Sequence, residues 1–265
     1  MKHLWKQMGG YDALVEYNEC AVRQLIKKWE QAKAKDIGYR EFIVNESKEV
    51  GINLGYINID QYRQDIYRWY LIHPYGCIDA FVPQFKEDLK SFGFNINLDY
   101  ENSSEIEKLI QGLQSSGVIV TVEDFKLNLE KYYRKCRNLL AHKLNEKDIQ
   151  KAENLYKKLD KEKIFAFYPS FKEALQANNF FNFNDYTLCT ANLKNITDTL
   201  TTNVFNHIDW SKFDIERQIP TIIKLRKYGN NKERIKEGIK RAIKQVYGVE
   251  IPEEYLTIVC DKLAQ

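Results

Sequence analysis

Hydrophobic positions recur at helical spacing through most of the chain. From Tyr11 to about Lys35, apolar residues lie three or four positions apart with charged residues between them, which predicts one amphipathic helix. Residues 36–60 contain three glycines and a weaker period. A short helix followed by a loop is therefore expected there, and the loop is expected to mark the first domain boundary.

The next hundred residues predict a group of about four helices. The run 61–93 is helical in pattern on both sides of His73 and Pro74, where the proline is expected to break or kink the helix. Three further helices each begin at a residue suited to capping: Ser103 or Ser104, Thr121 before Glu123 and Asp124, and Asn145, whose helix runs to Leu159.

The third of these helices carries an apolar stripe that is expected to face the core: Leu129, Tyr132, Tyr133, Cys136, Leu139 and Leu140. Further amphipathic helices are expected near 170–177, 185–205, 214–228, 231–247 and 252–263. The predicted fold is all-α. A four-helix core (61–160) is expected between an N-terminal helical extension (1–60) and a C-terminal helical region (161–265) that packs on it.

Composition narrows the class of protein. A chain of 265 residues can bury a core without disulfides or a structural metal. Its five cysteines are far apart and form no CxxC pair, and with four histidines a multi-histidine metal centre is not expected. Neither a secretion signal nor some twenty uninterrupted apolar residues are found. We therefore expect a cytoplasmic protein without a cofactor.

The net charge of +3 does not indicate binding to nucleic acid by charge alone, so local charge matters more. Residues 224–244 hold nine Lys or Arg against two Glu. Candidate RNA-binding residues in this stretch are Lys224, Arg226, Lys227, Arg234 and Arg241. The alternative is a basic surface that serves solubility.

One short motif carries candidate chemistry. The familiar GxSxG, GxxxxGK[ST], GxGxxG and HExxH patterns are absent from the sequence, but RNLLAH (137–142) comes at the end of an amphipathic helix. Histidine can take up or release a proton near neutral pH, and the planar guanidinium of arginine can hold a phosphate. The alternative is that Arg137 and His142 are cations favoured by the negative end of a helix.

With this motif and this order of helices, residues 62–160 resemble the HEPN superfamily, whose ribonucleases carry Arg-x(4–6)-His near the end of the penultimate core helix. The resemblance implies a metal-independent endoribonuclease that leaves a 2′,3′-cyclic phosphate. It also implies Arg137 and His142 as the catalytic pair and a homodimer whose two motifs form one cleft. The substrate would be tRNA or other single-stranded RNA, the role that of a toxin or phage-defence effector, and an antitoxin or regulatory protein would be a further partner.

Helix geometry modifies this assignment. Five residues separate Arg137 from His142, which places them about 140° apart around an ideal helix. Arg134, Asn138 and His142 share one face instead. Asn138 is therefore expected to be an orienting or a phosphate-contacting group, and Arg134 a second cation. The resemblance also implies a polar residue on the first core helix that supports the motif, and Asp79 is the candidate. The alternative is a solvated or helix-start carboxylate.

Two other functions remain open. The chain is either the ribonuclease or a catalytically silent HEPN module that binds a nucleotide or a protein partner, and a purely structural scaffold is the third reading. A HEPN toxin that is silenced by modification of a tyrosine two residues after the histidine is disfavoured, because Leu144 occupies that position in this chain.

Overall fold

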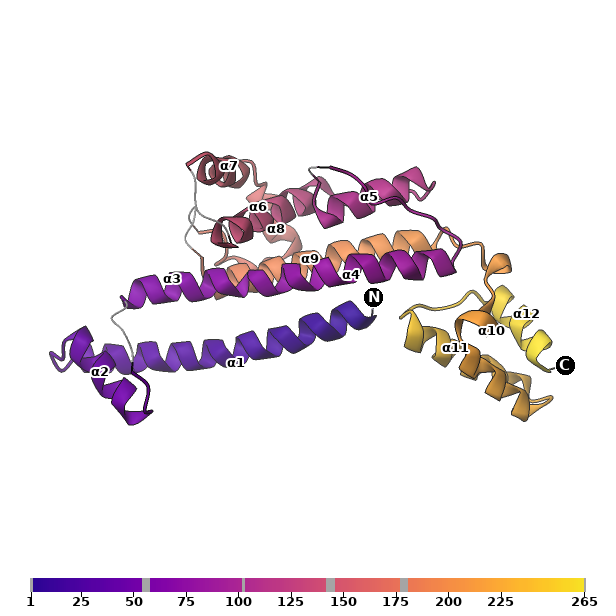
Figure 1. Ribbon diagram of the computed structural model, residues 1–265, viewed down its shortest axis with the longest axis horizontal. Helices are drawn as coiled ribbons and strands as arrows, with labels where there is room; N and C mark the ends of the chain where they lie inside the picture. The colour runs from indigo at the N-terminus through magenta and orange to yellow at the C-terminus, as the bar shows by residue number, and fades with distance from the viewer. Residues whose placement is uncertain (1, 54–57, 102, 142–145, 177–180, 265) are drawn as a thin grey trace. The chain divides into compact units, whose positions relative to one another are not determined.

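The computed structural model describes residues 2–53, 58–101, 103–141, 146–176 and 181–264, and every regular element in these ranges is a helix (Figure 1). This confirms the all-α class. The α-helices are α1 (Lys2–Lys33), α2 (Tyr39–Glu49), α3 (Ile59–Tyr70), α4 (Ile72–Ser91), α5 (Glu105–Ser115), α6 (Asp124–Ala141), α7 (Glu146–Lys157), α8 (Lys161–Phe167), α9 (Phe183–Phe205), α10 (Ile215–Gln218), α11 (Lys232–Val246) and α12 (Glu253–Ala264). Three 3-10 helices are η1 (Pro169–Phe171), η2 (Trp210–Lys212) and η3 (Pro220–Tyr228).

Prolines and one strained residue explain where the helices differ from the expected ranges. The break expected near Pro74 falls at Leu71, and Pro74 occupies the first turn of α4, where no backbone N–H is needed. The expected helix 170–177 is wrong. Leu175 has φ 57°, a left-handed conformation that an α-helix does not accommodate. Pro220 likewise divides the expected helix 214–228 into α10 and η3.

The first helix begins earlier than expected. α1 starts at Lys2 and runs through Gly9 and Gly10, although each glycine weakens a helix by about 1 kcal/mol relative to alanine. Leu4 and Met8 are each 1% exposed, so burial of their side chains favours the longer helix.

The described residues group into two compact units, each made of segments that are distant in sequence. Unit 1 comprises residues 1–7, 76–123 and 194–265, and unit 2 comprises residues 8–75 and 124–193. The expected division into 1–60, 61–160 and 161–265 stays a prediction.

Unit 2 is held together around α6. This helix packs against α3, α7 and α8. Tyr132, Tyr133 and Leu129 of α6 are each at most 1% exposed, and the phenol of Tyr132 lies 5.6 Å, ring to ring, from Tyr156 of α7. Buried tyrosines with hydrogen-bonded hydroxyl groups thus give this unit a core that is apolar and still specific in its contacts.

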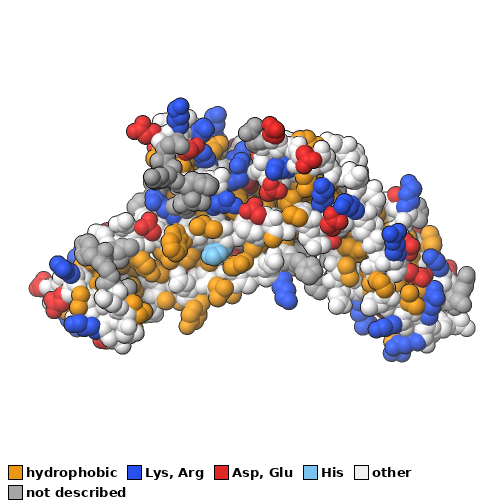
Figure 2. All heavy atoms as spheres, viewed as in Figure 1, with side chains coloured by type: hydrophobic (Ala, Val, Ile, Leu, Met, Phe, Trp, Pro, Cys, Tyr) orange, Lys and Arg blue, Asp and Glu red, His pale blue; other side chains and the backbone are white. Residues whose placement is uncertain are grey.

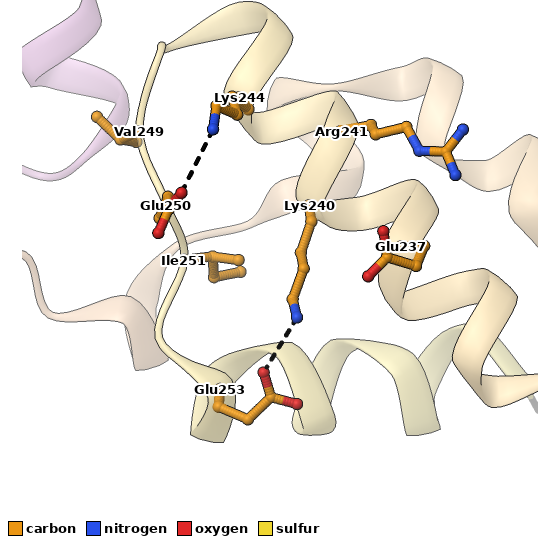
Figure 3. Close-up of a pocket in the computed structure, with 8 residues that line it drawn as sticks. All are labelled: Glu237, Lys240, Arg241, Lys244, Val249, Glu250, Ile251 and Glu253. Atoms are coloured by element: carbon orange, nitrogen blue, oxygen red, sulfur yellow. Dashed lines mark hydrogen bonds and ion pairs between the residues drawn. The ribbon is translucent and has the colours of Figure 1, made fainter.

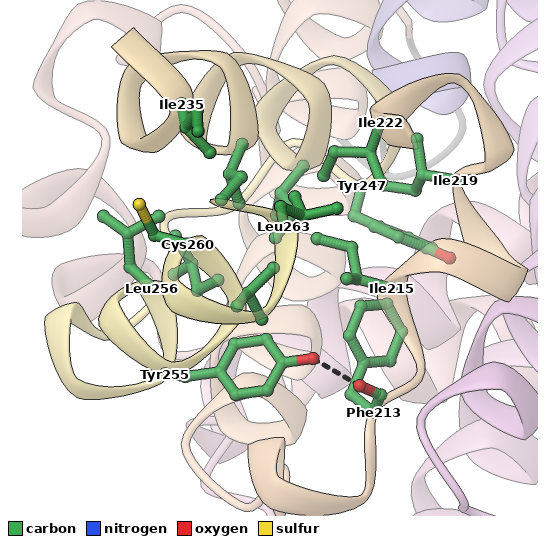
Figure 4. Packing of buried hydrophobic residues seen from close by; sticks show 14 of the residues in the cluster. Phe213, Ile215, Ile219, Ile222, Ile235, Tyr247, Tyr255, Leu256, Cys260 and Leu263 are labelled. Atoms are coloured by element: carbon green, nitrogen blue, oxygen red, sulfur yellow. Dashed lines mark hydrogen bonds between the residues drawn. The ribbon is translucent and has the colours of Figure 1, made fainter. Parts of the chain in front are cut away.

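Unit 1 contains a separate apolar cluster formed by η2, α10, η3, α11 and α12 (Figure 4). Ile235, Ile239 and Ile243 recur every four residues along α11 and are completely buried. The Tyr255 hydroxyl donates to the carbonyl oxygen of Phe213, which satisfies both polar groups inside the cluster.

The α5 segment of unit 1 begins at one of the two caps that its sequence predicts. Ser104 is the N-cap: its hydroxyl accepts from the Glu107 N–H, and the Glu107 carboxylate accepts from the Ser104 N–H. On the buried side of α5, a Cβ placed on Gly112 would lie 2.5 Å from the carbonyl oxygen of Asn97. The glycine therefore allows the 96–98 backbone to approach the helix closely.

Gly112→Ala is expected to destabilise the protein by about 1–3 kcal/mol, because the added methyl meets a backbone oxygen that cannot turn away. Gly10→Ala is the matched control. Gly10 is exposed and a Cβ there would have no heavy atom within 4 Å, so this change should stabilise by up to about 1 kcal/mol. Thermal unfolding of both variants gives the comparison, and a stabilising Gly112→Ala would contradict the close packing of α5.

Candidate active site

Residues 137–141 of the RNLLAH motif form the C-terminal end of α6. The stripe expected to face the core is confirmed for four residues that are each at most 3% exposed: Leu129, Tyr132, Tyr133 and Cys136. Leu139 is partly exposed. The buried stripe fixes the rotation of α6, and the partly exposed Arg137 and Asn138 lie off this stripe.

Tyr75 is fixed against α6 beside the motif. Its hydroxyl donates to the backbone carbonyl oxygen of Glu130 at 2.8 Å, and its side chain is buried. Burial raises the pKa of Tyr75 well above the ordinary value for tyrosine, so the phenol stays protonated and neutral. Tyr75 therefore provides a rigid aromatic wall and no proton-transfer group near neutral pH.

Arg137 lies against this wall. Its guanidinium carbon is 5.4 Å from the centroid of the Tyr75 ring, within the range of a cation–π contact. Its Nη1 donates to Asn138 Oδ1 at 3.0 Å. This hydrogen bond turns the guanidinium toward the side of the helix that carries Asn138.

Arg134 forms an ion pair one turn earlier. Its Nε lies 3.3 Å from Glu130 Oε1, and the side chains are 31% and 1% exposed respectively. Asn138 follows Arg134 by four residues and so lies next to it on the helix surface. The structure thus brings Arg134, Arg137 and Asn138 together, with a buried carboxylate beneath Arg134.

Two of the expected site residues are not placed beside this group. His142 lies outside the described residues, as do Leu144 and the expected cap Asn145. Asp79 lies in α4 within unit 1, whereas the motif lies in unit 2. The roles of His142 and Asp79 stay predictions.

α7 is attached to α6 next to the motif. Lys135 of α6 lies 2.5 Å from Asp148 Oδ1, and Lys151 lies 3.7 Å from the same oxygen. Because Asp148 is in the first turn of α7, its charge also favours the positive end of that helix. An ion pair therefore joins the penultimate turn of α6 to the first turn of α7.

Sequence reasoning missed two residues of this site. Tyr75 is 62 positions before Arg137, and no local pattern relates them. Glu130 could have been found, because it precedes Arg134 by four residues, the spacing at which opposite charges meet on a helix. The burial of Glu130 could not be predicted from the sequence, since this burial depends on the packing of Tyr75 and the neighbouring helices.

The second candidate surface is the basic C-terminal stretch. Figure 2 shows Lys and Arg side chains interspersed with Asp and Glu over the part of the molecule that contains α10, α11 and α12. Many of these cations are paired: Arg226 with Glu216 (3.2 Å), Lys232 with Asp261 (2.6 Å), Lys236 and Lys240 with Glu253 (3.2 and 3.4 Å), and Lys244 with Glu250 (3.3 Å).

A cavity of about 450 Å³ lies between α11 and residues 249–253 (Figure 3). Lys240 and Lys244 point across it to Glu253 and Glu250, whereas the Arg241 side chain extends away from both carboxylates. Charges of both signs line this cavity, so it is no simple anion pocket. Of the expected RNA-binding residues, Arg226 is paired with Glu216.

Comparisons with protein-family models, with curated proteins and with solved structures found no match for this chain. Within the described ranges, no three His, Cys, Asp or Glu side chains are grouped so as to hold a metal ion. No helix in those ranges is both long enough and apolar enough to span a membrane.

Proposed function

We propose that this chain is a metal-independent endoribonuclease of the HEPN type, with Arg137 and His142 as its catalytic pair. The observation that carries the proposal is the placement of Arg137: its guanidinium is held by the Tyr75 ring and by Asn138 at the end of α6, five residues before His142. A cation held in this way has a defined position in which to receive a phosphate.

The reaction uses groups already present in RNA. A 2′-hydroxyl attacks the adjacent phosphorus, a base takes the hydroxyl proton, and the bond to the 5′-oxygen breaks as an acid protonates that oxygen. The products are a 2′,3′-cyclic phosphate and a 5′-hydroxyl. Histidine can act as base or acid near neutral pH, and the guanidinium opposes the negative charge that accumulates on the phosphorane oxygens.

An acid and a base require two titratable groups, and the motif supplies one histidine per chain. A symmetric homodimer with both motifs in one cleft would supply two, with a guanidinium from each chain. Light scattering on the purified protein tests this step. Full activity from a monomer would overturn the composite site and leave the role of Arg137 to be judged separately.

The proposed setting is the cytoplasm, where an RNA-cleaving protein would act as a toxin or phage-defence effector. Such an activity must be restrained, and an antitoxin or regulatory protein is the expected partner. Expression of the parent protein should arrest growth, and expression of His142→Ala to the same level should not. Equal toxicity would favour the silent binding module.

The direct test is cleavage of labelled single-stranded RNA or tRNA in excess chelator. The parent protein should cleave, and the products should carry a 2′,3′-cyclic phosphate that phosphatase does not remove until acid has opened it. Products with a 5′-phosphate, or activity abolished by the chelator, would show that other chemistry is responsible.

A further inference from the structure

The cations of the C-terminal stretch form two sets. The paired set has a carboxylate within 4.0 Å: Arg226, Lys232, Lys236, Lys240 and Lys244. The open set consists of Lys224, Lys227, Arg234 and Arg241. Each is exposed, and among the described residues none of these four has a carboxylate oxygen within 4.0 Å of its charged nitrogens.

The paired and open cations of α11 lie on different flanks of the helix. Lys232, Lys236, Lys240 and Lys244 recur every four residues on the flank that faces the acidic residues of α12 and of the segment before it. Arg234 and Arg241 are seven residues apart, so they share another flank, two turns from each other. The charge balance of this region is therefore uneven around the helix.

The open flank of α11 adjoins η3. Gly238, between the two arginines, is so close to η3 that a Cβ there would lie 2.5 Å from Leu225 Cδ2. Next to this contact, the Tyr228 ring has the Arg234 guanidinium carbon 4.3 Å from its centroid and the Lys227 Nζ 5.1 Å from it. Two cations thus share one aromatic ring.

Like charges that converge without a counter-ion repel one another, and an anion placed between them relieves the repulsion. Guanidinium groups favour phosphate because their planar donors match its oxygens. A protein partner would instead require an apolar centre with a polar rim, and the open set offers four exposed cations, two of which lie against one tyrosine ring. These features favour a phosphate backbone.

We infer that Lys224, Lys227, Arg234 and Arg241 form a surface that binds the phosphate backbone of single-stranded RNA. The choice of RNA over another polyanion rests on the proposed function, whereas the binding surface rests on the arrangement of charges in unit 1. Arg226 and the lysines on the α12 flank are excluded from it because carboxylates already neutralise them.

Two quadruple variants of the full-length chain test this surface, both in the Arg137→Ala background so that the RNA stays intact. The first replaces the open set with glutamine. The matched control replaces Lys232, Lys236, Lys240 and Lys244 with glutamine and changes the net charge by the same amount. Affinity for a fluorescein-labelled, mixed-sequence 20-nucleotide RNA is measured by anisotropy at several salt concentrations.

The Kd for this RNA should be at least tenfold higher in the open-set variant and less than threefold higher in the control variant, each relative to Arg137→Ala alone. The slope of log affinity against log salt should fall in the open-set variant by roughly 0.7 for each phosphate contact removed. Equal losses in both variants, or no loss in the first, would overturn the surface. So would open-set-dependent binding to anionic lipid vesicles that is tighter than binding to RNA.

The outcomes separate this inference from the nuclease proposal. Cleavage is measured separately, in chains that keep Arg137. Open-set-dependent RNA binding, together with no RNA cleavage by the parent chain, would overturn the nuclease and leave the surface intact. Cleavage by the parent chain that is unchanged when the open set is replaced with glutamine, together with unchanged affinity, would overturn the surface alone. Because all four side chains are exposed, unfolding is not expected to obscure either result.

Discussion

Arg137→Ala is expected to lower the rate of RNA cleavage by roughly a hundred- to a thousandfold, the usual effect of removing one group that opposes charge in a transition state. His142→Ala is expected to lower it by about a hundred- to ten-thousandfold, since it removes a proton-transfer group. Both losses should appear in single-turnover rates with saturating protein, because they concern the chemical step more than the encounter with RNA. Cleavage retained in both variants would exclude this motif as the active site.

Graded substitutions separate the role of the charge from that of its position. Arg137→Lys keeps a cation but loses the planar pair of donors, so partial activity is expected. Asn138→Ala removes the hydrogen bond that turns the guanidinium, and a loss of about tenfold is expected if that bond positions Arg137 in the transition state. Arg217→Ala, at an exposed arginine of α10, is the control and should leave the rate unchanged.

The fold was predictable wherever local signals decide the structure. Ser104 caps α5 through its own hydroxyl and Glu107, three residues away, and both are visible in the sequence. The buried stripe of α6 was likewise predictable, because burial follows the helical period. Elements that depend on distant contacts were missed: α1 extends through two glycines because Leu4 and Met8 are buried, and Leu175 ends regular structure in a left-handed conformation.

In the candidate site, too, local features were predictable and distant contacts were not. The spacing of Arg134, Arg137 and Asn138 on one helix could be read from the sequence, and the structure shows them close together. The hydrogen bond that turns Arg137 toward Asn138 depends on side-chain conformation, and Tyr75 comes from another helix. Likewise, the sequence shows the excess of cations in residues 224–244, but the carboxylates that neutralise four of the six cations of α11 lie beyond it, in residues 250–261.

Asp185→Asn is expected to destabilise the protein by about 1–3 kcal/mol. The buried Asp185 carboxylate accepts three hydrogen bonds: from the Tyr133 hydroxyl (2.9 Å) and the Leu175 N–H (3.0 Å) at Oδ1, and from the Asn182 N–H (3.0 Å) at Oδ2. An asparagine presents one oxygen and one NH2 group. One of the buried donors would then face another donor, which costs about the free energy of desolvating that group.

The effect of this substitution should depend on pH. Burial is the main cause of a raised pKa at Asp185, above the ordinary value of 3.8. The native state therefore holds this proton more tightly than the unfolded state, and the contribution of the carboxyl group to stability is largest below pH 3.8 and declines as pH rises through the native pKa. The difference in melting temperature between parent and Asp185→Asn should shrink from acid to neutral pH. A difference that grew with pH would contradict the raised pKa.

Asp198→Asn is the matched control, because Asp198 lies exposed on the same helix, and its effect should stay within about 0.5 kcal/mol. Tyr133→Phe removes one donor and leaves two, so a loss of about 1 kcal/mol in stability is expected.

The contacts of Asp185 also connect it to the helix that carries the motif. Its bond to Tyr133 fixes α6 one turn before Arg137, and its bond to Leu175 holds a strained residue whose carbonyl oxygen accepts from Tyr156 and Lys161. If the motif depends on this support, Asp185→Asn should slow RNA cleavage at a temperature where the protein remains folded, and Asp198→Asn should not.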